Sequence, residues 1–202
     1  MIFETGHLYH IYNQGNNRQK VFFSGENYLY FLKKIKLHIL PYADILAWCL
    51  MPNHFHLMVY VHTVEVEISS GSATPSRAPT RNITNLNKSI GIMLASYTRA
   101  INKQENRSGS LFRENTKAEC ITKIDGITPS FYNTSNGTLI NQHSIEVEYP
   151  QVCFDYLHFN PVRAKLVKQP EEWSYSSYRD YTGLRDGKLI NRNRAEEFRI
   201  TF

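Results

Sequence analysis

Two histidines separated by one residue are the strongest chemical signal in the chain. His54 and His56 flank Phe55, and alternation along a strand puts both imidazoles on one face. They directly follow the turn-forming pair Pro52-Asn53, so they stand at a strand end that a substrate can reach. Two imidazoles can bind one metal ion, although histidines in apolar strands often serve only as hydrogen-bonding groups. A metal site needs a third ligand, and the candidates are Asn160, Asp155, His158, His10 and His143.

A tyrosine and an amide are spaced to meet on one side of a helix. Tyr156 and Asn160 lie four residues apart, which is the spacing of helical neighbours. A neutral phenol attacks phosphorus poorly, and a nearby cation that polarises the phosphate offsets this weakness. A metal site and a tyrosine therefore belong together in DNA strand transfer, although any one of the 13 tyrosines is more often a packing or surface residue, and Asn160 before Pro161 is also an ordinary helix stop. Tyr97 is the alternative nucleophile, although its apolar neighbours at helical spacing indicate a core position.

A basic segment points to a polyanionic partner. The chain has 23 Lys and Arg against 18 Asp and Glu, a formal charge of +5, and residues 88–117 hold six of the cations with two glutamates. Such a run can be an ordinary solvated face, or it can contact phosphates with an affinity that falls with salt. Unpaired bases could stack on Tyr12, Phe22 or Phe23. The predicted DNA-binding residues are Asn17, Arg18, Arg99, Lys103, Arg107 and Arg113.

Five strings of residues resemble one known family. MPNHFHL at 51–57 resembles the HUH motif of the single-strand DNA transposases that use one tyrosine. DYLHFNPVRA at 155–164, followed by WSYSSY at 173–178, resembles the C-terminal signature of the REP-associated tyrosine transposases. YHIYNQGNNR at 9–18 and SGSLF at 108–112 fit the same family. In this order the strings cover most of residues 7–181.

The resemblance implies a specific reaction. His54 and His56 would bind a divalent ion, magnesium or manganese, and Asn160 would assist them. Tyr156 would attack a phosphodiester of single-stranded or hairpin DNA, leaving a 5′-phosphotyrosine link and a free 3′-hydroxyl. The reverse reaction would rejoin strands without added energy, because the link conserves the energy of the broken bond.

Two other functions fit parts of the pattern. A domesticated hairpin-DNA-binding protein without cleavage activity would bind a structured oligonucleotide in a salt-sensitive way and form no phosphotyrosine adduct. A metalloenzyme acting on small molecules would use the two histidines, but it would leave the basic segment and the tyrosine motif without a role. The chain could act as a monomer or a homodimer, because related single-strand transposases include both.

Composition indicates a single globular domain. The 202 residues are 42% hydrophobic and 13% aromatic, enough for a core that excludes wholesale disorder. No apolar run approaches the roughly 18 residues that a membrane helix needs, and the N-terminus resembles no secretory signal, so we expect a cytoplasmic protein without membrane contact. Cys49, Cys120 and Cys153 are odd in number and widely spaced, which argues against disulfides and a cysteine zinc site.

Hydrophobic periodicity and turn residues predict the elements that position these groups. We expect the last helix to stop at Asn160-Pro161, because the residue before proline avoids helical backbone, and Asn160 to cap a short helix that follows. Ser24 should cap the first helix, and Asn85 or Asn87 the second. The predicted elements are strands at 8–13, 45–50, 55–61 and 118–122 and helices at 27–40, about 85–104 and 150–159.

The element order predicts the fold class. Strand, helix, strand, strand, helix, strand, helix is the order of a ferredoxin-like split βαβ fold, an α+β antiparallel sheet with helices packed on one face. Polar insertions are expected near 63–84, as a flexible loop, and near 125–144. Residues 1–202 would then form a single HUH-type transposase domain.

Overall fold

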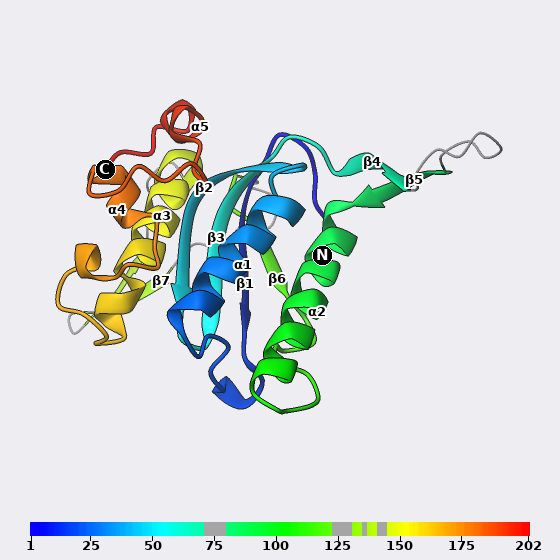
Figure 1. Ribbon diagram of the computed structural model, residues 1–202. Coiled ribbons are helices and arrows are strands. Elements are labelled where there is room, and N and C mark those ends of the chain that lie inside the picture. The colour runs from blue at the N-terminus through cyan, green and yellow to red at the C-terminus, as the bar shows by residue number, and fades with distance from the viewer. Residues whose placement is uncertain (71–79, 123–130, 135–136, 141–144) are drawn as a thin grey trace.

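A four-stranded antiparallel sheet in the order β2-β3-β1-β6 forms the centre of the molecule (Figure 1). The computed structural model describes residues 1–70, 80–122, 131–134, 137–140 and 145–202. Helix α1 (Gly25–His38) connects β1 to β2, and α2 (Leu86–Gln104) precedes β6. The predicted ferredoxin-like α+β class is confirmed. The sheet strands are β1 (Leu8–Gln14), β2 (Ala43–Met51), β3 (His54–Val61) and β6 (Lys117–Cys120).

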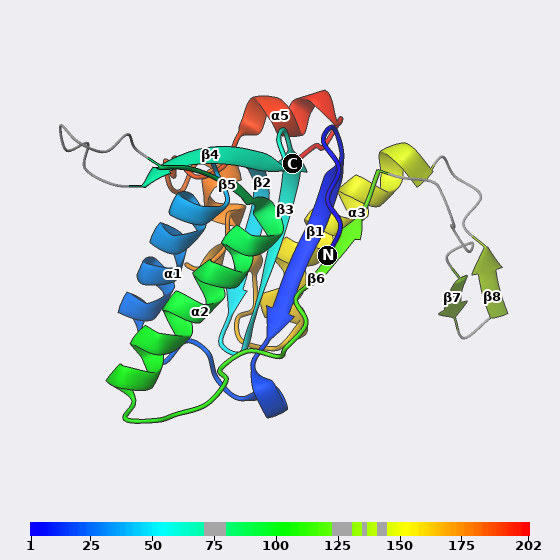
Figure 2. The same cartoon turned by 90° about the vertical axis from the view of Figure 1, so that its right-hand side faces the viewer.

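Helices α1 and α2 lie side by side on one face of the sheet (Figure 2). Ser24 caps α1 in a capping box with Asn27, and the Asn85 side chain caps α2 by accepting the Lys88 N–H, so Asn85 rather than Asn87 starts that helix. Both helices bury an apolar face against the strands, including Phe31 of α1.

The opposite face of the sheet is also covered, by α3 (Ile145–Arg163) (Figure 2). The prediction that helices pack on one face holds for α1 and α2, and α3 adds a layer on the other. Its Phe154 and Leu157 pack against Cys49 and Met58 of the sheet. Nearly all residues of β2 and β3 are buried, because both faces of the sheet carry a covering layer.

Helix α3 runs through Asn160-Pro161 and ends at Arg163, so the predicted interruption and the predicted capping role of Asn160 are wrong. Pro161 lies in the last turn, where its missing N–H removes one helical bond near an end. The carbonyls of Asn160 and Pro161 still accept the N–H groups of Ala164 and Leu166 at 2.9 and 3.0 Å. The local proline preference is overridden by these bonds.

Each of the two predicted polar insertions contains a two-stranded antiparallel β-ribbon. Strands β4 (Glu65–Ser70) and β5 (Thr80–Asn85) pair antiparallel along their whole lengths, so the loop predicted at 63–84 is wrong for the described part. Residues 71–79 lie outside the described residues. In the predicted insertion near 125–144, β7 (Phe131–Thr134) pairs with β8 (Gly137–Ile140), and 123–130, 135–136 and 141–144 lie outside the described residues.

The C-terminal segment fastens α3 to the edge of the sheet. Ser177 Oγ lies 2.8 Å from His158 Nε2 of α3 and accepts the backbone N–H of Trp48 in β2. Ion pairing between Asp180 and Arg185 closes the following loop. No helix in the described part of the chain is long and apolar enough to cross a membrane. The short elements are η1 (Asn16–Arg18), η2 (Pro170–Glu172), α4 (Tyr178–Tyr181) and α5 (Arg192–Glu197).

Candidate active site

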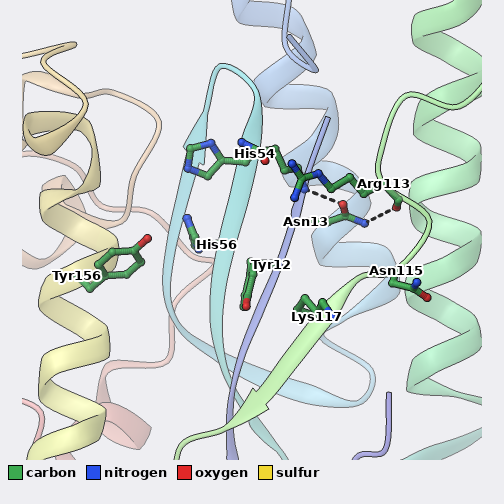
Figure 3. A pocket seen from close by; sticks show the side chains of 9 residues that line it. Tyr12, Asn13, His54, His56, Arg113, Asn115, Lys117 and Tyr156 are labelled. Atoms are coloured by element: carbon green, nitrogen blue, oxygen red, sulfur yellow. Dashed lines mark hydrogen bonds between the residues drawn. The ribbon is translucent and has the colours of Figure 1, made fainter. Parts of the chain in front are cut away.

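The two histidines of β3 lie on the sheet face that α3 covers. Phe55 and Leu57 point into the core under α1 and α2, so strand alternation turns His54 and His56 the other way. Their rings are 4.9 Å apart between centroids and nearly perpendicular. The structure therefore places both imidazoles on the same face of β3, as the strand alternation predicts (Figure 3).

Hydrogen bonds orient both imidazoles. His54 Nδ1 lies 2.6 Å from Asn53 Oδ1, and His56 Nδ1 lies 2.8 Å from His10 Nε2. Asn160 Nδ2 donates to His56 Nε2 over 3.0 Å. His56 is therefore held at both ring nitrogens, by His10 at Nδ1 and by the Asn160 amide at Nε2.

Burial keeps these imidazoles neutral. It lowers the pKa of His56 well below the usual 6.5, and the nearby His10 and His54 lower it further. It lowers the pKa of His10 to about 4 against a smaller opposing effect of Glu119. It also lowers the pKa of His54, which the bond with Asn160 partly opposes. Neutral imidazole is the form that binds metal ions.

Helix α3 brings Tyr156 to this pair. Its ring centroid lies 5.5 Å from that of His56 and 6.2 Å from that of His10, and the residue is 37% exposed. Figure 3 shows the phenol pointing from α3 toward the imidazoles. Asn160, one turn later, is buried against His56. The guanidinium of Arg163 lies 5.3 Å from the Tyr156 ring centre, a cation–π contact that holds the ring in place.

A cavity of about 370 Å³ opens between Tyr156 and the loop that leads into β6. Arg113 and Lys117 stand on the wall opposite Tyr156 (Figure 3). The lining contains two cations and no carboxylate, so it favours an anionic ligand. The lining residues are Tyr12, Asn13, Gln14, His54, His56, Arg113, Asn115, Lys117 and Tyr156.

A second tyrosine of the cavity differs chemically from Tyr156. The Tyr12 hydroxyl donates to Glu119 over 2.6 Å. This bond, with burial as a lesser cause, raises the pKa of Tyr12 to about 12. A phenol with a raised pKa is harder to deprotonate, so Tyr12 forms the reactive phenolate less readily. Of the two tyrosines that line the cavity, Tyr156 is therefore the better placed to react.

The donor set fits a divalent ion held by two imidazoles and an amide oxygen. In the part of the chain that the structure describes, no group of three or more His, Cys, Asp or Glu side chains is placed to hold a metal, so a third ligand must come from another residue type. Asn160 meets this need, because turning its amide would direct Oδ1 to the place beside His56 Nε2 that its Nδ2 now occupies. Mixed nitrogen and oxygen donors suit manganese better than magnesium.

The other candidate ligands lie elsewhere or have other partners. Asp155 is exposed and accepts a hydrogen bond from Gln151. His158 is buried behind α3 against Ser177, and His10 bonds to His56. His143 lies outside the described residues.

The predicted DNA-binding residues do not all gather at the cavity. Arg113 lines it. Arg99 and Lys103 are exposed on α2, which packs on the other face of the sheet. Arg107 donates to Gln19 over 2.7 Å, close to the exposed Asn17 and Arg18 of η1, whose residues do not line the cavity. Phe22 is buried in the core and Phe23 is partly exposed away from the cavity.

The alternative nucleophile is excluded by its surroundings. Tyr97 of α2 is fully buried in the core, with its ring against Phe31 of α1, and its hydroxyl donates to the Val21 carbonyl over 2.8 Å. Burial raises the pKa of this phenol. No phosphodiester can reach it without opening the core.

Comparison with known proteins identifies the fold. No family model and no curated protein matches the sequence. A solved structure of a REP-associated tyrosine transposase bound to a REP hairpin is similar, with a TM-score of 0.54 and 14% sequence identity. The match covers 95% of this chain and 95% of that chain. The two proteins therefore share a fold over nearly their whole lengths.

Several residues of the site carry too little local signal to be found in the sequence. Asn115 and Gln14 line the cavity but belong to ordinary polar loops. Arg163 contacts Tyr156 only because α3 continues past Pro161. The bond from His10 to His56 depends on how β1 aligns with β3. Strand alternation does place His10 on the same face as Tyr12, and this was the one signal available.

Proposed function

We propose that this chain is a metal-dependent tyrosine transposase, a DNA strand transferase of the HUH superfamily that cleaves and rejoins single-stranded hairpin DNA. The observation that carries the proposal is the position of Tyr156 across a cationic cavity from Arg113 and Lys117, with its ring beside His56. The five sequence strings and the fold shared with a hairpin-bound transposase support the same function.

The chemistry assigned to Tyr156 is one displacement at phosphorus. Its Oη forms a bond to the phosphorus of a phosphodiester while the bond from phosphorus to the 3′-oxygen breaks. The phenol proton passes to water, and the leaving 3′-oxygen takes up a proton to become a 3′-hydroxyl. The covalent 5′-phosphotyrosine keeps the number of phosphoester bonds constant, so attack by a 3′-hydroxyl can reverse the step.

The surrounding residues would orient this displacement. Arg163 contacts the phenol ring from the same helix, and Asn160 ties that helix to His56. Fixed geometry of this kind lowers the entropic part of the barrier. Arg113 and Lys117 would hold phosphates of the strand on the facing wall. A divalent ion bound by His54, His56 and the Asn160 amide would supply positive charge to the phosphate oxygens.

A gel assay tests the proposal. We would incubate the full chain and Mn²⁺ with a labelled pool of hairpin oligonucleotides that carry randomised single-stranded flanks, and run the products on a denaturing gel. We expect a covalent protein–DNA band that requires Mn²⁺ and is absent for Tyr156→Phe. The matched control is Tyr149→Phe, because Tyr149 lies on the same helix with a similar exposed fraction, 40% against 37%. Tyr149 does not line the cavity.

The other outcomes each contradict the proposal in a defined way. Hairpin binding without any covalent band would instead favour a binding protein that lacks cleavage activity. Absence of both binding and cleavage would favour a metalloenzyme acting on small molecules. A band that persists in Tyr156→Phe would assign the nucleophile to another residue.

A further inference from the structure

We propose that His10 is a positioning residue that holds the proton of His56 on Nδ1 and thereby directs the Nε2 lone pair of His56 into the candidate metal site. The inference rests on the proposed function, because His56 is there a metal ligand. Its structural part, the position of one proton, is a property of the metal-free protein. The sequence made His10 a candidate third metal ligand. Its hydrogen bond to His56 assigns it the role of orienting a ligand instead.

The contact between the two imidazoles is close and enclosed. His10 Nε2 lies 2.8 Å from His56 Nδ1, and the rings stack with centroids 5.0 Å apart at an angle of 24°. The residues are 9% and 5% exposed, so water does not compete for this bond. A neutral imidazole has one N–H and one lone pair, so one ring must donate and the other accept.

Asn160 decides which ring donates. Its Nδ2 donates to His56 Nε2 over 3.0 Å, so this Nε2 carries the lone pair. The His56 proton is then on Nδ1 and is donated to His10 Nε2. In the other tautomer His56 would carry its proton on Nε2. That N–H would then face the N–H of the Asn160 amide, and Nδ1 would have no proton to donate to His10. Metal-binding histidines commonly donate their second N–H to such an outer partner.

The sheet fixes the positions of both rings. His10 lies on β1, between β3 and β6, and is paired with Met58 of β3 and Glu119 of β6. Tyr12 is the direct cross-strand partner of His56. His10, two residues before Tyr12, is therefore the diagonal neighbour of His56 on the same face. Because β1 and β3 are central strands, the two rings cannot separate without moving the middle of the sheet.

Nitrogen NMR of the imidazoles tests the proton position. Two-bond ¹⁵N–¹H correlation spectra of the ¹⁵N-labelled, metal-free full chain distinguish Nδ1–H from Nε2–H for each histidine. We expect Nδ1–H for His56 in the wild type. A signal showing Nε2–H for His56 in the wild type would overturn the inference, and this measurement needs no variant that has to fold.

Two variants test the consequence for metal binding. His10→Gln keeps a side-chain carbonyl that can accept the His56 proton, whereas His10→Phe keeps the ring shape and removes the acceptor. By Mn²⁺ electron paramagnetic resonance we expect His10→Phe to weaken Mn²⁺ binding by about 10- to 100-fold, and His10→Gln to restore most of the affinity. Equal Mn²⁺ affinity in the wild type and a folded His10→Phe variant would contradict the positioning role.

These readouts separate failure of the inference from failure of the proposed function. If His56 carries Nδ1–H and Mn²⁺ affinity depends on His10, while no hairpin forms an adduct, the inference holds and the tyrosine transposase assignment fails. If DNA cleavage is found but His56 carries Nε2–H, the assignment holds and the inference fails.

Discussion

Asn160 connects the helix that carries Tyr156 to the strand that carries the histidines, through a hydrogen bond of 3.0 Å from its Nδ2 to His56 Nε2. It lies one helical turn after Tyr156, and at 8% exposure it is enclosed. A displacement of this part of α3 relative to β3 must therefore strain or break this bond. This connection makes the phenol, the amide and the imidazoles one unit.

Removing either imidazole should remove metal binding. We expect His54→Ala and His56→Ala each to weaken Mn²⁺ binding by at least 10-fold, because the remaining donors are one imidazole and one amide. Titration of Mn²⁺ by electron paramagnetic resonance measures this. His62→Ala is the control, since His62 is exposed just beyond the end of β3. An equal loss in the control, or none in the other two, would place the metal elsewhere.

The cavity wall should dominate the salt dependence of DNA binding. The log of the DNA association constant falls with the log of the salt concentration, and each lost phosphate contact makes this slope less steep by about 0.7 for single strands. The double variant Arg113→Ala/Lys117→Ala should therefore make it less steep by about 1.4. The comparison is Arg99→Ala/Lys103→Ala, which removes the same charge from α2 on the other face of the sheet.

Fluorescence anisotropy with a labelled hairpin in EDTA measures binding of both variants without cleavage. We expect a clearly smaller change of slope for the α2 pair. Equal changes would show that the DNA contacts both faces or that only net charge matters.

Acid should destabilise the fold through His158. Burial lowers the pKa of His158 to about 3, below the 6.5 of an exposed histidine. The unfolded state therefore binds a proton that the folded state excludes, and stability is present above pH 6.5 and lost as the pH falls toward 3. The loss from this group is about 1.4 kcal/mol per pH unit in that window.

Urea unfolding of the wild type and His158→Leu at pH 7 and pH 5 measures this effect. The variant loses the bond to Ser177 and should be less stable at pH 7, but its stability should fall less between the two pH values. Parallel losses in both proteins would mean that His158 is not the group responsible.

Local patterns predicted the parts of the site that depend on one element. Alternation in β3 put His54 and His56 on one face, and helical spacing put Tyr156 and Asn160 on one side of α3. The proline rule failed at Asn160-Pro161, because the bond from Asn160 to His56 and the carbonyl bonds of the last turn outweigh a local preference. Tertiary contacts decided the end of that helix.

The sequence did not predict how helices and strands far apart in the chain lie relative to one another. The basic segment gave no sign that Arg113 and Lys117 face the cavity while Arg99 and Lys103 lie across the sheet. Which face a helix covers depends on how the strands are ordered, and no single segment encodes that order. The pairing of β1 with β3, which places His10 against His56, is also a property of the sheet.

The attachment point of the DNA tests the central claim most directly. The covalent adduct formed with Mn²⁺ and the hairpin pool is digested with nuclease and protease, and mass spectrometry locates the remaining nucleotide. We predict a 5′-phosphate on the Oη of Tyr156. A nucleotide found on Tyr12, Tyr149 or any other residue would contradict the account.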